Sequence, residues 1–148
     1  PCVSVSTLES MAYNFLSTDC IVCTVMDARC SQVYNALFEI KNGVVTRLCD
    51  DRALSLDDLK NELLSVDGRI IIAGDGTDIT YKYIGNEIKN AESAPVNLKY
   101  QRASSTALVA FEMINNGQTV SAQELMPVYL RLPQAQRELN KKLGGRTK

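Results

Sequence analysis

The sequence predicts one α/β domain in which a mixed β-sheet is flanked by helices. Three observations lead to this prediction. Short apolar runs bounded by turn residues alternate with segments whose apolar residues recur at helical spacing. The runs at 20–26 and 69–73 are apolar on both faces, which is typical of covered central strands. Asn42-Gly43 lies between two further runs and indicates a hairpin, so part of the sheet is antiparallel.

The first half of the chain yields its elements from local signals. Val3 and Val5 predict a short buried strand. Ser6 and Glu9 fit a capping box, in which each side chain accepts from the other's backbone. A helix is predicted after it, with the apolar stripe Leu8, Met11, Ala12, Phe15 and Leu16, and 17–19 closes it. Residues 32–40 and 44–48 are the expected hairpin strands, joined by a type I′ turn because Asn and Gly accept a positive φ.

The second half is predicted in the same way. Ser55 is the expected N-cap of a helix that carries Leu56, Leu59, Leu63 and Leu64 on one side. A strand over 69–73, a turn at 74–76 and a helix over 78–87 follow, then a loop with a short strand over 90–98. The last helix is predicted over 104–115 and ends at Gly117, with Ala107, Leu108, Phe111 and Ile114 inward. Residues 121–131 are expected to form a turn and an extended arm.

Composition excludes several classes of function. The 148 residues contain no histidine, so this chain cannot supply a histidine triad, an imidazole base or a histidine-ligated zinc. The formal net charge of −1 gives no broad positive field to hold a polyanion. No apolar run of about 18 residues is present, so no membrane helix is predicted. Five cysteines without a secretory signal favour reduced thiols and a cytoplasmic protein.

The pair Cys20 and Cys23 has the spacing of a redox or zinc motif. It lies in a predicted strand, where residues three apart point to opposite faces, and no second pair completes a zinc site. We therefore interpret both cysteines as small core residues.

Three other segments have residues with functional chemistry. Gly74-Asp75-Gly76 has the look of a phosphate loop but neither the spacing nor the lysine of one, so a strand-to-helix turn is favoured. Asp27 and Arg29 stand where the central strand ends, and Tyr34 opens the next strand. The acid and the guanidinium either brace a turn through a bidentate pair or bind a substrate or partner, with the brace favoured.

The segment 127–131 carries an aromatic and a cation. Tyr129 is expected either half-buried against the domain or, with Arg131, presented to a partner, because tyrosine and arginine are enriched at interface anchors. The carboxylates Asp19, Asp50 and Asp51 are interpreted as solvated caps. The candidate interaction or turn-bracing residues are therefore Asp27, Arg29, Tyr34, Tyr129 and Arg131, with no catalytic, metal or cofactor residue.

Four segments, in order over residues 1–131, resemble the TsaB (YeaZ) family. The run 3–9 (VSVSTLE) is similar to the family's strand-to-helix junction, and 26–34 is similar to its "DAR…vY" signature. Residues 74–76 match its "GdG" turn, and 124–131 resemble its closing "aePvYlR" segment. The resemblance implies one lobe of an actin-like ATPase (ribonuclease H-like) fold.

The family has two lobes, and its first carries Gly-rich and Thr-rich motifs that are missing here. The resemblance therefore implies that residues 1–132 are the C-terminal lobe, that the N-terminal lobe is absent from the chain, and that 133–148 form a polar basic tail. The start at Pro1, without an initiator methionine, also leads us to expect a fragment.

The family's role implies a non-catalytic scaffold of the complex that forms threonylcarbamoyl-adenosine next to the anticodon of tRNAs. Its partners would be the catalytic paralogue TsaD and the ATPase TsaE, with tRNA bound indirectly, no cofactor and no membrane, and a homodimer left open. The alternative is a glycoprotease-type hydrolase or an ATP-binding actin-fold enzyme.

Overall fold

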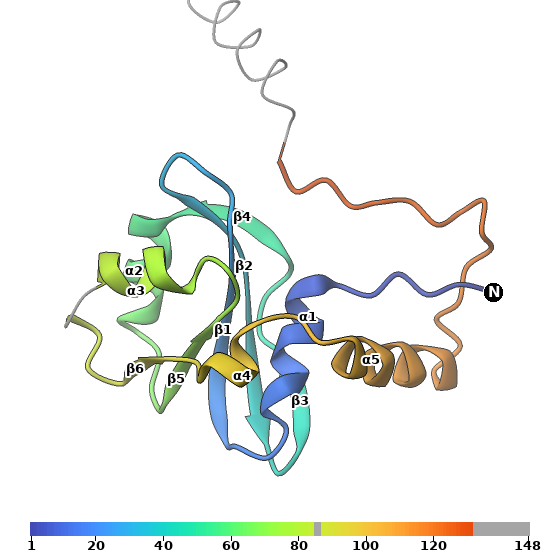
Figure 1. The fold of residues 1–148 in the computed structure, drawn as a ribbon, viewed down its shortest axis with the longest axis horizontal. Coiled ribbons are helices and arrows are strands. Elements are labelled where there is room, and N and C mark those ends of the chain that lie inside the picture. Colours follow the sequence, from blue (N-terminus) through green and yellow to red (C-terminus); the bar gives the residue numbers. More distant parts are fainter. Residues whose placement is uncertain (85–86, 132–148) are drawn as a thin grey trace, which may run out of the picture.

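The computed structural model describes residues 1–84 and 87–131. The basic tail expected over 133–148 therefore lies outside the described residues. In the described part no helix is long and apolar enough to cross a membrane. Two regions are visible in Figure 1: a body built around a sheet, and a C-terminal region of one helix and an extended arm that lies beside the first residues of the chain.

A six-stranded mixed sheet forms the body, as predicted. Its strands run β3-β2-β1-β5-β6, with β4 also paired to β2. The central strand β1 is antiparallel to β2 and parallel to β5. The strands are β1 (Cys20–Asp27), β2 (Gln32–Lys41), β3 (Val44–Arg47), β4 (Arg52–Ser55), β5 (Ile70–Ala73) and β6 (Ala91–Ser93).

Helices cover both faces of this sheet. α1 (Thr7–Ala12), continued by the 3-10 turn η1 (Tyr13–Phe15), packs on one face with Phe38 and Ile40. α2 (Leu56–Leu63) and α3 (Thr77–Ile84) pack on the other with Val25, Ile70 and Ile72. The short α4 (Val96–Lys99) and then α5 (Ala103–Asn115) follow β6. The two apolar layers explain why β1 is apolar throughout.

The predictions that rest on neighbouring residues in the sequence are confirmed. Asn42 and Gly43 have φ values of 52° and 75°, which confirms the turn with positive φ at both positions. Ser55 caps α2, its hydroxyl oxygen accepting from the Asp58 amide at 3.1 Å. α5 ends as expected at Gly117, where the Gly117 and Gln118 amides bond back to the carbonyls of Ile114 and Met113.

Two expectations were wrong, and two elements were missed. Residues 3–5 form no strand, because in the described residues only the neighbouring Cys2 finds a partner, in an isolated bridge to Val120. β4 and α4 were not predicted. The face assigned to α5 is reversed, since Ser105 and Val109 are buried. The residues expected inward are exposed: Ala107, and Leu108, Phe111 and Ile114 at 48%, 63% and 53%.

Candidate groove between the arm and the first helix

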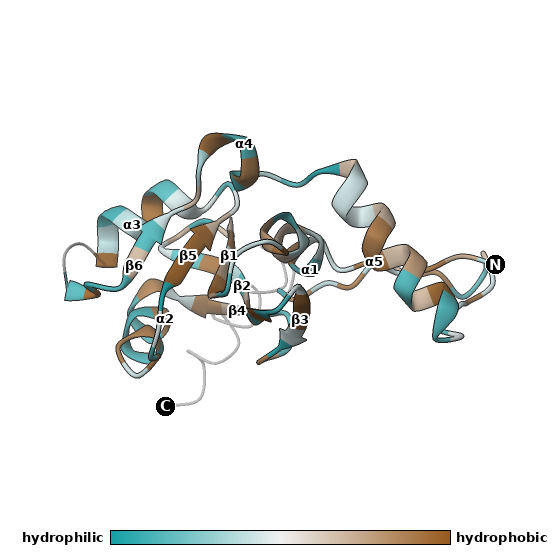
Figure 2. Cartoon of the chain, turned by 90° about the horizontal axis from the view of Figure 1, so that it is seen from below, coloured by the Kyte–Doolittle hydropathy of each residue, from teal (hydrophilic) through white to brown (hydrophobic). Residues whose placement is uncertain are grey.

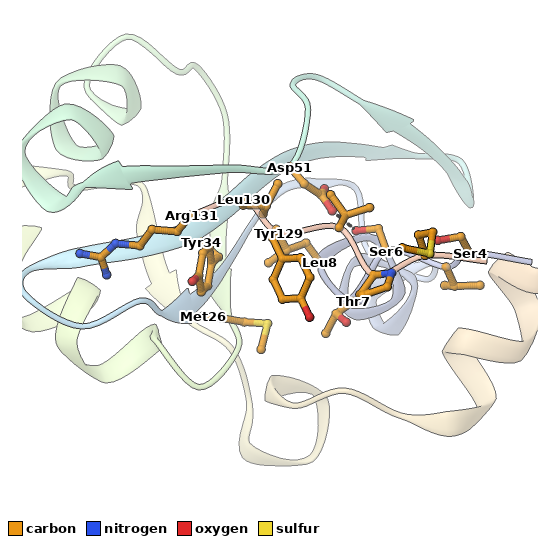
Figure 3. A pocket seen from close by; sticks show the side chains of 14 residues that line it. Ser4, Ser6, Thr7, Leu8, Met26, Tyr34, Asp51, Tyr129, Leu130 and Arg131 are labelled. Carbon is orange, nitrogen blue, oxygen red and sulfur yellow. Dashed lines mark hydrogen bonds between the residues drawn. The ribbon is translucent and has the colours of Figure 1, made fainter. Parts of the chain in front are cut away.

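A groove of about 460 Å³ lies between the start of the chain and the arm, which we define as residues 121–131. The two walls are more than a hundred positions apart in the sequence, and the sheet forms the floor (Figure 3). The lining residues are Ser4, Val5, Ser6, Thr7, Leu8, Met26, Tyr34, Asp51 and the arm residues 126–131.

The first wall is fixed by the beginning of α1. The Ser6 hydroxyl oxygen accepts from the Glu9 amide at 3.2 Å, and the same hydroxyl donates to the Asp51 carboxylate at 2.5 Å. The capping box is thus only half formed, because the Glu9 carboxylate turns to the Arg47 guanidinium at 2.7 Å. This second contact fastens α1 to the sheet instead of to its own N-terminus.

Arg47 is the centre of this ion network. Its guanidinium also lies 2.6 Å from Asp51 and 4.8 Å from the ring centroid of Phe38. Burial works against the charged form, but the hydrogen bonds that the guanidinium donates to Asp51 and Glu9 outweigh it and raise the pKa of Arg47. Asp51 was expected to be a solvated cap, but its side chain is only 24% exposed. Its carboxylate accepts hydrogen bonds from Arg47 and from the Ser6 hydroxyl, so its negative charge is already compensated.

The floor consists of Met26 and Tyr34, which stand opposite each other in the β1–β2 register. Both are partly buried and pack against the α1 side of the sheet. Antiparallel neighbours of this kind lie within van der Waals reach. The floor is therefore a thioether beside an aromatic ring, a surface that receives apolar or aromatic groups.

The arm forms the second wall and is mostly exposed. Val128 and Tyr129 are 76% and 82% exposed, so the half-buried alternative for Tyr129 is wrong. At the end of the arm the Arg131 guanidinium donates to the Ala28 carbonyl, which fastens the arm to the tip of the β1–β2 hairpin. Figure 3 shows the Arg131 side chain reaching past Tyr34 while the Tyr129 ring lies over the groove.

The hairpin tip at 28–31 has an uncommon backbone. Arg29, Cys30 and Ser31 have φ values of 64°, 54° and 56°, all in the left-handed region. The Asp27 carboxylate accepts from the Arg29 amide at 2.7 Å and bridges the start of the tip. The Arg29 guanidinium is 3.6 Å from Asp27 but 86% exposed, so the carboxylate and the backbone, rather than a bidentate ion pair, hold the tip.

The turn at 74–76 contacts the end of β1, where the hairpin tip begins. A Cβ on Gly74, whose φ is 118°, would stand 1.9 Å from the Val25 carbonyl oxygen, so only glycine fits. The Asp75 carboxylate accepts from the Asp27 amide at 3.2 Å. Residues 74–76 therefore form the turn between β5 and α3, and this turn packs against the end of β1.

Comparisons with known proteins show what this chain is similar to. No family model matches the chain. The chain is 27% identical over 137 residues to the curated "tRNA threonylcarbamoyladenosine biosynthesis protein TsaB" of Bacillus subtilis, a match that covers 92% of this chain and 58% of that protein. This likeness agrees with the TsaB (YeaZ) resemblance expected from the sequence.

Two solved structures confirm the fold. The chain is similar to YeaZ from Pseudomonas aeruginosa at a TM-score of 0.60 and 20% identity, covering 84% of this chain and 58% of that one. It is also similar to an uncharacterised protein described as similar to peptidase YEAZ from Pseudomonas aeruginosa, at a TM-score of 0.61 and 19% identity, covering 86% and 57%. The mixed α/β fold expected from the TsaB resemblance is thereby confirmed, and the chain spans under two thirds of each relative's length.

The groove brings together part of the set of candidate interaction residues named from the sequence. Tyr34, Tyr129 and Arg131 line it, whereas Asp27 and Arg29 lie at the hairpin tip, joined to it through Ala28. Sequence reasoning missed Met26 and Asp51 as lining residues. The capping serine of the TsaB-like junction was the one available signal for this wall, because a cap fixes where a helix begins.

The two cysteines of the CxxC pair separate as expected. Cys20 packs in the α1-side core and Cys23 in the opposite core. Burial is the main cause that raises the pKa of the Cys23 thiol to about 12. Within residues 1–84 and 87–131 no three carboxylate or thiol side chains converge on a point that a metal could occupy.

Proposed function

We propose that this chain is one lobe of a TsaB-type subunit that takes part in forming threonylcarbamoyladenosine on tRNA. The observation that carries the proposal is the likeness to the Bacillus subtilis TsaB protein over 92% of the chain. The fold agrees with it, since the structural neighbours are YeaZ proteins. Residues 1–132 would be the lobe, and the protein would act in the cytoplasm.

The subunit would act through protein contacts rather than chemistry. Around the groove the carboxylates serve as structural partners: Glu9 and Asp51 are both bonded to Arg47. A general base needs a free carboxylate or imidazole within reach of substrate, and these carboxylates are committed to holding α1. A TsaD-like catalytic paralogue and a TsaE-like ATPase are the proposed partners, with tRNA reached through them because the chain's net charge is −1.

The groove is the proposed contact site. Tyr129 is exposed over a floor formed by Tyr34 and Met26, and such an arrangement suits an aromatic or aliphatic side chain of a partner. Arg131 would act indirectly, because its hydrogen bond to the Ala28 carbonyl holds the arm in place opposite α1. Asp27 would set the hairpin tip to which the arm is fastened.

The test is the modification state of tRNA in cells that lack the gene. Depleting the protein should remove threonylcarbamoyladenosine from digested tRNA, measured by liquid chromatography and mass spectrometry, and the wild-type gene should restore it. Tyr129→Ala should restore less, because it removes an exposed aromatic contact. Val44→Ala should restore it fully, since Val44 is exposed on β3, outside the groove.

Two results would count against this proposal. The first is modification that persists at its normal level after depletion. The second is micromolar ATP affinity, or peptide hydrolysis, by the purified chain in calorimetry and activity assays, which would favour the alternative of an actin-fold enzyme or glycoprotease-type hydrolase.

A further inference from the structure

In the described residues, hydrogen bonds hold the arm to the body at its two ends and not between them. At its start the backbones of Cys2 and Val120 exchange two hydrogen bonds, at 2.8 and 2.9 Å. In Figure 2 this end of α5 lies beside the N-terminus, away from the sheet. At the other end the Arg131 guanidinium donates to the Ala28 carbonyl. The span 126–130 therefore crosses the groove without hydrogen bonds to the rest of the described chain.

Burial does not hold this span either. Met126, Val128 and Tyr129 are 68%, 76% and 82% exposed, whereas Leu130 and Arg131 are partly buried. Packing against the body is thus concentrated at the last two residues of the arm. A segment with few buried apolar contacts opens locally at low cost while the rest of a domain stays folded.

A self-contained turn follows the first attachment. The Ser121 amide donates to the Glu124 carboxylate at 2.9 Å, and the Glu124 amide donates back to the Ser121 hydroxyl at 3.3 Å. The amides of Glu124 and Leu125 also donate to the Ser121 carbonyl, both at 3.1 Å. These bonds all lie within 121–125, so the turn keeps its shape when the residues beyond it move. It has the properties of a hinge.

The second attachment uses a braced carbonyl. Ala28 is 4% exposed, and the Asp27 carboxylate before it accepts from the Arg29 amide at 2.7 Å. The Asp27 amide in turn donates to the Asp75 carboxylate at 3.2 Å. The tip is therefore fixed before the Arg131 guanidinium reaches it from the arm. A hydrogen bond from a charged group is strong, but here it is a single contact.

We propose that the arm is a strap over the groove, hinged at the turn 121–125 and latched by Arg131 on the Ala28 carbonyl. When the latch is released, the arm swings away at the hinge and uncovers the floor of the groove. When the latch forms again, Tyr129 closes over an occupant of the groove (Figure 3). The identity of that occupant rests on the proposed function. The strap is a property of the isolated chain, so it is measured without a partner.

Limited proteolysis with chymotrypsin measures the opening. A protease must draw the residues on both sides of the cut into its own cleft, so the bond after Tyr129 is cut only when Leu130 and Arg131 have left the tip. The rate of this cut then follows the population of the open arm. Arg131→Met keeps an aliphatic side chain but removes the donors, and it should raise the rate about tenfold. Arg131→Lys, which keeps a cation, should fall in between.

Two references make the rates comparable. Each rate is divided by that of the same bond in a free peptide of the same sequence, which removes the effect of the substitution on the protease. The bond after Tyr100, a residue that is 51% exposed in the body, is cut in the same reaction and should keep its rate in every variant.

A matched pair of aspartates separates the latch from a general loosening of the sheet. Asp27→Ala loosens the tip without changing the sequence around the cut, and it should also speed the cut after Tyr129. Asp19→Ala removes the same kind of brace just before β1, where the carboxylate accepts from the Asn42 amide at 2.9 Å. It should leave the cut after Tyr129 unchanged.

The proposal is overturned if the wild-type chain is cut after Tyr129 as fast as the free peptide, or if Arg131→Met is cut at the wild-type rate. Equal acceleration by Asp19→Ala, or a parallel rise in the cut after Tyr100, would also overturn it. Amide exchange tests the hinge, since the amides of Cys2 and Val120 should stay protected in Arg131→Met and their exposure would contradict a hinge at 121–125. Failure of the strap appears in the purified chain, whereas failure of the proposed function appears in the tRNA of depleted cells.

Discussion

The body (residues 7–102) and the C-terminal region (residues 103–131) are built on different principles. In the body, both faces of the sheet are covered, and large side chains such as Phe38, Leu59 and Ile72 are completely buried. In the C-terminal region the large side chains are mostly outside: Phe111, Met126 and Tyr129 are 63%, 68% and 82% exposed. The body therefore supplies stability by burial, whereas the C-terminal region presents apolar surface.

Charge follows the same division. The body fastens its elements with ion pairs, for example Arg47 with Glu9 and Arg52 with Glu62. Between residues 103 and 131 only Glu112, Glu124 and Arg131 are charged, and each is bonded within the chain. Exposed apolar surface with no free charge has the composition of a contact surface, and its helix and turns are nevertheless formed.

The sharpest way to break this comparison is to truncate a phenylalanine in each region. Phe38→Ala should lower the free energy of unfolding by about 3–5 kcal/mol, because it leaves a cavity in a closed core. Phe111→Ala should change it by less than about 0.5 kcal/mol in dilute solution. Urea denaturation followed by circular dichroism measures both. Equal losses would mean that α5 is as much a part of the core as β2.

Two glycines give a smaller contrast. Gly74→Ala should cost about 2–3 kcal/mol, because its Cβ would collide with the Val25 carbonyl. Gly117→Ala, at a φ of 71° but with no atom within 4 Å of its Cβ, should cost about 1 kcal/mol from backbone strain alone. The same denaturation measurement separates them, and the reverse order would contradict the close approach of β1 to the turn.

The hydrogen bond from Tyr13 to Glu112 joins the two regions. Tyr13→Phe should lower stability by about 1 kcal/mol and increase amide hydrogen exchange in α5 more than in β1. Uniform exchange changes across both elements would show that α5 and the body unfold as one unit.

Alkaline pH should act on the same contact. Burial, then the Glu112 carboxylate, raises the pKa of Tyr13 above that of a free tyrosine. A raised pKa stabilises the fold below about pH 10 and loses this contribution as pH rises further. The free energy of unfolding should therefore fall above about pH 10, and it should fall less steeply in Tyr13→Phe. Parallel pH profiles of the two proteins would contradict this.

The smallest effects are expected at the hairpin tip. Asp27→Ala should cost about 1 kcal/mol, whereas Asp27→Asn should cost less because its amide oxygen still accepts from the Arg29 amide. Arg29→Ala should cost about 0–1 kcal/mol, since the guanidinium is exposed. A larger loss of stability in Arg29→Ala would show that the ion pair between Arg29 and Asp27 braces the tip. Unchanged stability with lost partner binding would favour the alternative in which the pair serves a partner.

Sequence alone predicted the features that nearby residues decide. β1 was evident because a strand covered on both faces is apolar throughout. The Asn42-Gly43 turn was evident because its geometry depends on these two residues alone. β4 was missed because Arg52–Ser55 has no β-branched or aromatic residue, and pairing with β2 alone makes it a strand.

The errors lie where distant contacts decide. α5 is apolar on both sides, so periodicity could not tell which side the body would cover. The groove was invisible in the sequence because its walls, Ser6 and Tyr129 among them, meet only through the fold. Residue chemistry in the sequence named Tyr34, Tyr129 and Arg131 as candidates, but it could not supply the contact of Arg131 with Ala28 that fastens the arm.

The left-handed tip at 29–31 also bears on how far this protein could be stabilised. Three consecutive residues other than glycine hold a backbone conformation that costs each of them about 1 kcal/mol or more. Glycine would adopt the same φ without that steric cost, although its unfolded chain is more flexible, so a single replacement should gain a few tenths up to about 1 kcal/mol. Natural proteins seldom stand at their stability maximum. An engineer who wanted a more heat-resistant form would begin at this tip, far from the apolar surface of α5.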